Sequence, residues 1–130
     1  MTEPRWVLEE VVVSVHRMLI AEHGGSPGIR DRGLLESALA RPRQLYSYKS
    51  DSTIFEFAAA YAFGLAKNHP FVDGNKRTAL AIAGIFLEIN DSSLDAPEPE
   101  AVVIIEQLAA GNLSELELSE WFSDSSISDA

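Results

Sequence analysis

Residues 54–87, which read IFEFAAAYAFGLAKNHPFVDGNKRTALAIAGIFL, carry the strongest indication of the fold, because a short polar loop separates two strongly apolar segments. The first segment, residues 54–66, is apolar everywhere except at Glu56, counting Gly64 as apolar, and residues 78–87 carry no charge. Helices that are apolar on all sides are buried ones. We therefore expect two central core helices whose connecting loop opens at one end of the core, where binding and catalytic groups are commonly presented.

The rest of the chain also reads as helices joined by short loops, and sheet signals are scarce. Pro42 is expected just past the end of the second helix, since proline cannot continue a helix. We expect helices over residues 8–23, 31–39, 53–67, 75–89, 100–110 and 114–121, connections at 24–30, 42–52, 68–74 and 91–99, and a disordered, frayed tail at 123–130. The predicted fold class is all-α, a single domain over residues 1–122 built as a compact bundle of about six helices.

Length and composition limit the classes of protein to which the chain can belong. Its 130 residues are enough for one domain with a substantial core, and the absence of cysteine excludes disulfides and thiolate metal sites. No apolar run approaches the roughly 20 residues that span a bilayer, and the first residues lack the basic-then-apolar order of a signal peptide. We expect a cytoplasmic protein with no membrane partner.

Charge is distributed unevenly along the chain. The net charge is −10, yet all ten Lys and Arg lie within residues 1–77, and the remainder carries eleven acids and no cation. The cations that bind an anion must therefore come from the N-terminal part of the chain and the polar loop. This field argues against nucleic acid as a direct partner, because such binding needs clustered cations. The simpler interpretation of the acidic part is solubility.

The polar loop has the chemistry of a phosphate site. Gly74 allows a tight turn into the following helix, so the free N–H groups of the first helical turn can hold an anion. Lys76 and Arg77 lie in that same turn, where cations oppose the helix dipole unless an anion is bound. Asn75 can donate to a phosphate oxygen through its side-chain amide.

Two further residues of the loop suit catalysis. Asp73 is a hard oxygen ligand of the kind that holds Mg²⁺ together with substrate phosphates, so the metal would arrive with a nucleotide. An imidazole side chain can remove a proton from an attacking hydroxyl, which makes His69 the candidate for this step. Each also has a structural interpretation: a lone His often caps a helix, and Asp-Gly-Asn is ordinary turn chemistry. Phe71 is expected to anchor the loop between the two helices.

The nine residues 69–77, HPFVDGNKR, resemble the signature of the Doc (death on curing) branch of the Fic/Doc superfamily. Fic proteins carry H-P-F-x-[DE]-G-N-G-R-x-x-R, and this chain has Lys76 at the second glycine and Leu80 at the second arginine. Both differences are typical of Doc. The resemblance extends upstream over residues 23–31 and 33–42, HGGSPGIRD and GLLESALARP.

The resemblance implies an all-helical Fic fold and a toxin of a bacterial type II toxin–antitoxin pair. Doc relatives bind ATP in the reverse sense to Fic proteins and transfer its γ-phosphate to a threonine of elongation factor Tu, which blocks translation. On this basis His69 is the general base, Asp73 the Mg²⁺ ligand, and Gly74, Asn75, Lys76 and Arg77 the groups that bind the phosphates and offset charge during transfer. A lysine side chain at position 76 also occupies space that a glycine would leave to a diphosphate.

Residues 24–30 align with the flap that positions the target segment in this superfamily, and Ile29 and Arg30 are its candidate residues. The alternative is a plain connection between helices. We find no inhibitory [S/T]-x-x-x-E-[G/N] segment, so inhibition is expected from a separate Phd-type antitoxin that folds on binding, seated near the apolar face of the first helix.

Two other functions stay open at the level of sequence. The first is a Fic-type protein nucleotidyltransferase, which would add AMP instead of a phosphate to its target. The second is a noncatalytic module that keeps the fold and acts only by binding a partner. Substitution of His69 separates this last case, because a binding module should not need a general base.

Overall fold

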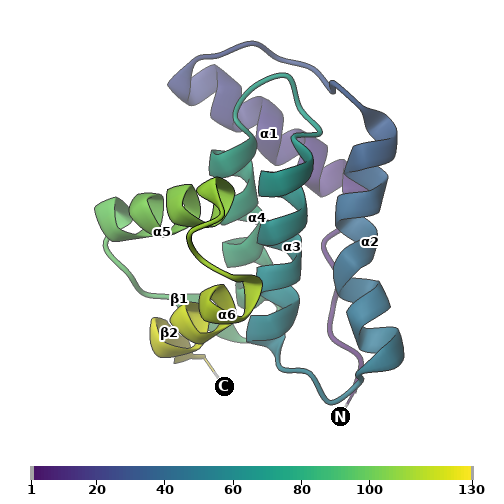
Figure 1. The fold of residues 1–130 in the computed structure, drawn as a ribbon, viewed down its shortest axis with the longest axis vertical. Coiled ribbons are helices and arrows are strands. Elements are labelled where there is room, and N and C mark those ends of the chain that lie inside the picture. Colours follow the sequence, from purple (N-terminus) through teal and green to yellow (C-terminus); the bar gives the residue numbers. More distant parts are fainter. Residues whose placement is uncertain (1, 130) are drawn as a thin grey trace.

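Two buried helices, α3 (Ile54–Asn68) and α4 (Asn75–Ile89), lie side by side at the centre of the computed structural model, which describes residues 2–129 (Figure 1). The close packing of α3 follows from its small side chains, since Ala58, Ala59, Ala60, Ala62 and Ala66 are all buried. At Gly64 a Cβ atom would lie 3.0 Å from the Cα atom of Ala38 on the neighbouring helix. The predicted pair of central core helices is confirmed.

The other elements surround this pair. Within residues 2–129 these elements are four further helices and one antiparallel two-stranded sheet: α1 (Glu9–His23), α2 (Arg32–Tyr48), α5 (Glu98–Ala110), α6 (Glu115–Asp124), β1 (Ser92–Leu94) and β2 (Ser126–Ser128). α2 packs along α3 on one side, while α5 and α6 lie on the other, and α1 packs against α4 at the end that carries the polar loop (Figure 1). The described residues therefore confirm the predicted all-α class with about six helices.

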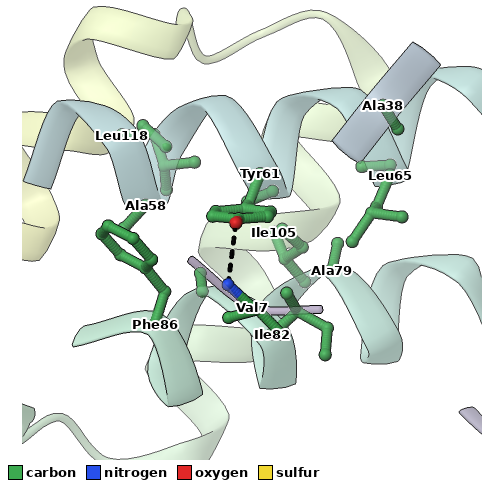
Figure 2. Packing of buried hydrophobic residues seen from close by; sticks show 14 of the residues in the cluster. Val7, Ala38, Ala58, Tyr61, Leu65, Ala79, Ile82, Phe86, Ile105 and Leu118 are labelled. Carbon is green, nitrogen blue, oxygen red and sulfur yellow. Dashed lines mark hydrogen bonds between the residues drawn. The ribbon is translucent and has the colours of Figure 1, made fainter. Parts of the chain in front are cut away.

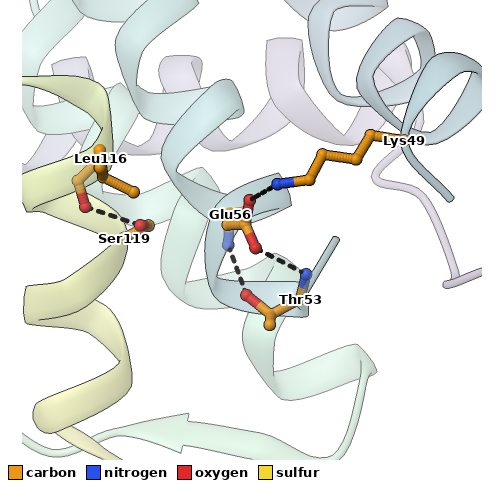
Figure 3. A network of polar contacts seen from close by, with 5 residues as sticks. All are labelled: Lys49, Thr53, Glu56, Leu116 and Ser119. Carbon is orange, nitrogen blue, oxygen red and sulfur yellow. Dashed lines mark hydrogen bonds and ion pairs between the residues drawn. The ribbon is translucent and has the colours of Figure 1, made fainter. Parts of the chain in front are cut away.

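Local sequence signals account for where several helices begin. Thr53 accepts a hydrogen bond from the backbone N–H of Glu56 at 3.2 Å, and the Glu56 carboxylate accepts one from the Thr53 N–H at 3.1 Å (Figure 3). This capping box starts α3, and Ser114 with Glu117 starts α6 in the same way. The other carboxylate oxygen of Glu56 pairs with Lys49 at 3.5 Å, which joins the end of α2 to the start of α3 (Figure 3).

The N-terminal segment before α1 is part of the core. Val7 is buried, and its N–H donates to the hydroxyl oxygen of Tyr61 on α3 at 3.0 Å (Figure 2). Trp6 stacks on Phe86 with ring centroids 6.0 Å apart and meets Phe57 edge to face at 5.5 Å. The segment therefore seals one side of the α3–α4 pair with aromatic contacts.

The second helix is longer than predicted. The sequence places its end before Pro42, but α2 continues through that proline to Tyr48. Pro42 is itself buried, and beyond it Leu45 and Tyr46 pack against the core. Packing of this last part outweighs the hydrogen bond that a proline cannot donate to the carbonyl four residues earlier. The predicted surface connection at 42–52 is thus mostly helix.

The C-terminal segment also differs from the prediction. The tail expected from residue 123 instead completes α6 and forms β2, in which Ile127 pairs with Ser93 of β1. The linker expected at 91–99 contains that partner strand and the start of α5 at Glu98. Three-residue strands are too short to show a period-two pattern, so the sequence gives little sign of them. Residue 130 lies outside the described residues.

Within residues 2–129, no helix combines the length and the apolar character that crossing a bilayer requires.

Candidate functional site

The polar loop leaves α3 through an unusual backbone conformation at His69. This residue follows the last residue of α3 and has φ 49° and ψ 55°, the left-handed region that non-glycine residues seldom occupy. The imidazole is exposed and lines a cavity that the rest of the loop also borders. A conformation of this kind persists only where surrounding contacts hold it, and such positions are common in functional sites.

Arg30 supplies those contacts. Its Nε donates to the carbonyl oxygen of His69 at 2.7 Å, and an Nη donates to the carbonyl oxygen of Asn68 at 2.9 Å. A cation at this position also suits the negative end of the α3 dipole. The side chain of Asn68 is held in turn, donating to the carbonyl of Leu34 at 3.0 Å. Arg30, predicted as a residue of the substrate flap, therefore has its guanidinium on the backbone of the candidate base.

The flap itself lies against the loop as a short piece of antiparallel pairing. Ile29 forms an isolated bridge with Phe71, in which the Arg30 N–H donates to the carbonyl of Pro70 at 2.7 Å and the Val72 N–H to that of Gly28 at 3.0 Å. Ile29 also packs on the core. The structure thus brings the predicted flap and the predicted catalytic loop together.

Asp73 presents an exposed carboxylate between the flap and α4. Its Oδ1 accepts from the N–H of Gly74 at 2.9 Å, and its Oδ2 accepts from the N–H of Ser26 at 3.3 Å. A Cβ atom at Gly25, where φ is 116°, would lie only 2.7 Å from that Oδ2. The flap backbone can come so close to the carboxylate only because residue 25 is glycine.

The side chain of Asn75 makes two hydrogen bonds within the loop. It is 8% exposed, its Oδ1 accepts from the N–H of Phe71 at 2.9 Å, and its Nδ2 donates to the Phe71 carbonyl at 3.0 Å. Both ends of the amide therefore close the loop onto its own backbone, because the loop buries the ring of Phe71 and its peptide groups need partners. The structure therefore gives this amide a structural role, and its donation to a phosphate stays a prediction.

Free backbone donors are present at the start of α4. Gly74, with φ 77°, precedes the helix, and the first helical hydrogen bond runs from the N–H of Thr78 to its carbonyl at 3.0 Å. Within residues 2–129, the backbone N–H groups of Asn75, Lys76 and Arg77 donate no hydrogen bond. Three unpaired donors at a helix N-terminus form a site for an anion.

Lys76 and Arg77 are exposed beside these donors, and neither forms an ion pair within the described part of the chain. Leu80, the residue that stands where Fic proteins carry a second arginine, is half-buried one turn further along α4. The first turn of α4 therefore offers two free cations and three free amides to one ligand, without a third cation.

A cavity of about 770 Å³ opens over this turn. Its volume lies within the usual range for small-molecule and cofactor sites. The predicted loop residues form one wall, and α5 forms another with both apolar and acidic side chains. The lining residues are Leu19, His23, His69, Val72, Asp73, Gly74, Asn75, Lys76, Arg77, Leu80, Ala81, Glu98, Val102, Ile105 and Glu106.

A divalent cation at this site would rest on Asp73. The described residues contain no group of three or more His, Cys, Asp or Glu side chains able to hold a metal ion. Mg²⁺ is often held by one carboxylate together with substrate phosphates and water, and an exposed carboxylate next to unpaired backbone amides fits that pattern. Asp73 is therefore the loop residue that could hold a metal ion.

Sequence reasoning missed His16 on α1. The residue is 2% exposed, its ring stacks on that of Phe71 with centroids 3.8 Å apart, and its Nε2 lies 2.8 Å from the carbonyl oxygen of Asp73. Its position between Val12 and Ile20, at a spacing of four residues, was the available signal, since it places an imidazole on an apolar helix face.

Comparison with known proteins agrees with the resemblance seen in the loop sequence. A family model described as the Fic/DOC family matches residues 6–87. The chain is similar to protein kinase doc of Escherichia phage P1, with 36% identity over 95 residues that cover 72% of this chain and 75% of the phage protein. It is also similar to Toxin Doc of Mycolicibacterium smegmatis, with 47% identity over 74 residues that cover 56% of this chain and 57% of that protein.

The matched residues extend from the N-terminal segment through the flap and the loop to α4, so they contain every element of the site except α5. Both relatives carry the Doc name, in agreement with Lys76 in the loop. The chain therefore belongs to the Fic/DOC family, and to its Doc branch.

Proposed function

We propose that this protein is the toxin of a type II toxin–antitoxin pair and transfers the γ-phosphate of ATP to a hydroxyl group of a host protein. The observation that carries the proposal is the single cavity that joins His69, Asp73, Lys76 and Arg77 to the free amides of α4. Phosphoryl transfer depends mainly on positioning and on electrostatic stabilisation, and these groups supply both.

Each group has a defined part in the reaction. The amides of α4, with Lys76 and Arg77, bind the phosphates and offset the charge that develops on the transferred group. His69 accepts the proton of the attacking hydroxyl while the oxygen of that hydroxyl bonds to the γ-phosphorus. The bond between the γ-phosphorus and the oxygen that bridges it to the β-phosphate breaks, and ADP leaves. Asp73 would hold Mg²⁺, which when bound neutralises phosphate charge.

The position of Leu80 supports phosphate transfer over AMP transfer. A half-buried leucine faces the cavity where a Fic protein has its second arginine, and the Lys76 side chain occupies the space of the second glycine. The groups available for phosphate binding are therefore concentrated at the first turn of α4, and we assign the reverse ATP orientation of Doc relatives to this chain.

The target and the partner come from the family resemblance. We propose elongation factor Tu as the target class, in the cytoplasm, with a block of translation as the result. We propose a Phd-type antitoxin as the inhibitor, with Leu8, Val11 and Met18 of the α1 region as its apolar contact, since these side chains are 51%, 37% and 63% exposed. Val7 and Val12, which the sequence places on the same face, are buried in the core instead.

Intact mass spectrometry of elongation factor Tu, after incubation with the protein, ATP and Mg²⁺, tests this proposal. The expected result is a gain of one phosphate with wild type and with Lys67→Ala, and no gain with His69→Ala. Lys67 is the control because it is exposed, lies two residues before His69 and is not part of the cavity lining. A gain of one AMP would identify a nucleotidyltransferase. Equal toxicity of wild type and His69→Ala, each expressed alone in cells, would support a noncatalytic binding module.

A further inference from the structure

His16 on α1 contacts two residues of the polar loop, Phe71 and Asp73. This histidine is buried on the face of α1 that packs against the loop, with its ring flat on Phe71 at an interplanar angle of 8°. A buried polar side chain is costly unless it is hydrogen-bonded. Its Nε2 has a partner, the carbonyl oxygen of Asp73 at 2.8 Å. Because a carbonyl oxygen only accepts, Nε2 carries the hydrogen.

That carbonyl belongs to the peptide unit that controls the Asp73 carboxylate. The C=O of Asp73 and the N–H of Gly74 lie at opposite ends of one planar peptide group, so fixing one direction fixes the other. The Gly74 N–H donates to Asp73 Oδ1 at 2.9 Å. A continuous set of contacts therefore runs from Phe71 through the His16 ring and the peptide plane to the carboxylate.

The same face of α1 also holds the next turn of the loop. A Cβ atom at Gly74 would lie 3.2 Å from the Cδ1 atom of Ile20 and 3.8 Å from the His16 ring. Helix α1 therefore packs closely on the residue that precedes the free amides of α4. Rotation of the Asp73–Gly74 peptide would turn the carboxylate and those amides away from a shared ligand.

We propose that His16 is a positioning residue for the metal–nucleotide complex, because it orients the Asp73 carboxylate through the Asp73–Gly74 peptide. This inference rests on the proposed function, since it assumes that Asp73 meets the metal of a bound nucleotide. Groups that orient a metal ligand typically change metal affinity or activity by about 10- to 100-fold when they are lost.

Two substitutions distinguish the contribution of the His16 ring packing from that of its hydrogen-bond donor. His16→Phe keeps a flat ring against Phe71 but cannot donate to the Asp73 carbonyl. His16→Gln loses the ring but carries an amide nitrogen that can reach the same oxygen. Val12→Ala is the matched control, because Val12 is fully buried one turn earlier on α1 and belongs to the general core.

The measurement is the affinity of Mn²⁺ for the protein in the presence of a nonhydrolysable ATP analogue, determined by electron paramagnetic resonance. Thermal unfolding is recorded for each variant alongside. We expect His16→Phe to bind Mn²⁺ at least about 10-fold more weakly than wild type with little change in unfolding midpoint, and His16→Gln to recover most of the affinity. We expect Val12→Ala to unfold at a lower temperature with unchanged Mn²⁺ affinity.

The inference is overturned if His16→Phe binds Mn²⁺ as tightly as wild type, or if Val12→Ala loses as much affinity as His16→Phe. In either case phosphate transfer by the wild type could still stand. If the wild type neither binds Mn²⁺ with the analogue nor transfers phosphate, the proposed function fails and this inference fails with it.

Discussion

Arg30 donates from Nε to the carbonyl oxygen of His69 at 2.7 Å, although 39 residues separate the two in the chain. The arginine comes from the flap, and the histidine is the candidate general base in a left-handed backbone conformation. The flap is therefore joined to the candidate catalytic loop by side chain as well as by backbone, so a substitution in one should alter the geometry of the other.

Replacing Arg30 by alanine should lower kcat for phosphate transfer by up to about 100-fold, since small misplacement of a reacting group can cost that much. The target KM should change less, because the guanidinium contacts the backbone of His69 rather than the outer edge of the flap. Steady-state kinetics with the purified target separate the two parameters. Arg32→Ala is the matched control, since Arg32 is exposed and pairs with Glu9. A rise in KM alone would show that Arg30 serves the target directly.

Alanine at Gly25 should push the flap away from Asp73, because its Cβ atom would lie 2.7 Å from the carboxylate Oδ2. We expect faster amide exchange across residues 24–28 and a rate of transfer reduced by about 10-fold or more. Hydrogen–deuterium exchange and a transfer assay measure both effects.

Gly24→Ala is the comparison for this substitution. Gly24 also has a positive φ, 86°, but a Cβ atom there would have no neighbour within 4 Å. If both variants behaved alike, backbone strain would account for the result and the contact with Asp73 would not.

Tyr61→Phe should destabilise the protein by about 1–3 kcal/mol, because the Val7 N–H would then be buried without an acceptor. Urea denaturation gives the change in the free energy of unfolding. Tyr46→Phe is the control, because it also removes only a hydroxyl, from a half-buried ring near the same cluster. Phe86→Leu would be less suitable because it alters the aromatic packing. A loss in Tyr61→Phe no larger than in Tyr46→Phe would contradict the prediction.

Glu115 should make stability depend on pH above the ordinary range of a carboxyl. Burial raises the pKa of Glu115 above its ordinary value of 4.5, and the charge and hydrogen bond of Arg41 oppose that rise only in part. The unfolded chain then loses this proton at a lower pH than the folded chain does. The stability contributed by the group is therefore fully present below pH 4.5 and is lost as the pH rises through the folded pKa.

Urea denaturation of wild type and Glu115→Gln over a series of pH values checks this sign. Glutamine does not titrate, so the wild-type free energy of unfolding minus that of the variant should fall as the pH rises. A difference that grows with pH would mean that the pairing with Arg41 outweighs burial.

The sequence was sufficient for the centre of the fold and for the identity of the loop. The two apolar segments predict α3 and α4 because burial on all sides needs no knowledge of distant contacts. Thr53 and Ser114 mark helix starts because a capping box is complete within four residues. The loop was recognisable because its functional groups are adjacent in the chain.

What the sequence could not show depends on partners far away in the chain. His16 lies 57 residues from the carbonyl that it binds, and only the packing of α1 brings them together. The guanidinium of Arg30 likewise binds a carbonyl that is distant in the sequence, 39 residues away. Pro42 would end a helix on local grounds, but packing of Leu45 and Tyr46 on the core carries α2 past it. β1 and β2 form because each supplies the other's hydrogen bonds, which a three-residue pattern does not reveal.

The small side chains of α3 also have a genetic consequence. Five buried alanines and Gly64 bring the neighbouring helices so near that a larger side chain has no space, and overpacking of a core is destabilising. If the protein is toxic when expressed alone, cells that survive its expression will carry missense mutations in two groups. One group will fall in the loop, and the other will enlarge these small residues, so survivor sequences would map the tightest part of the fold together with the active site.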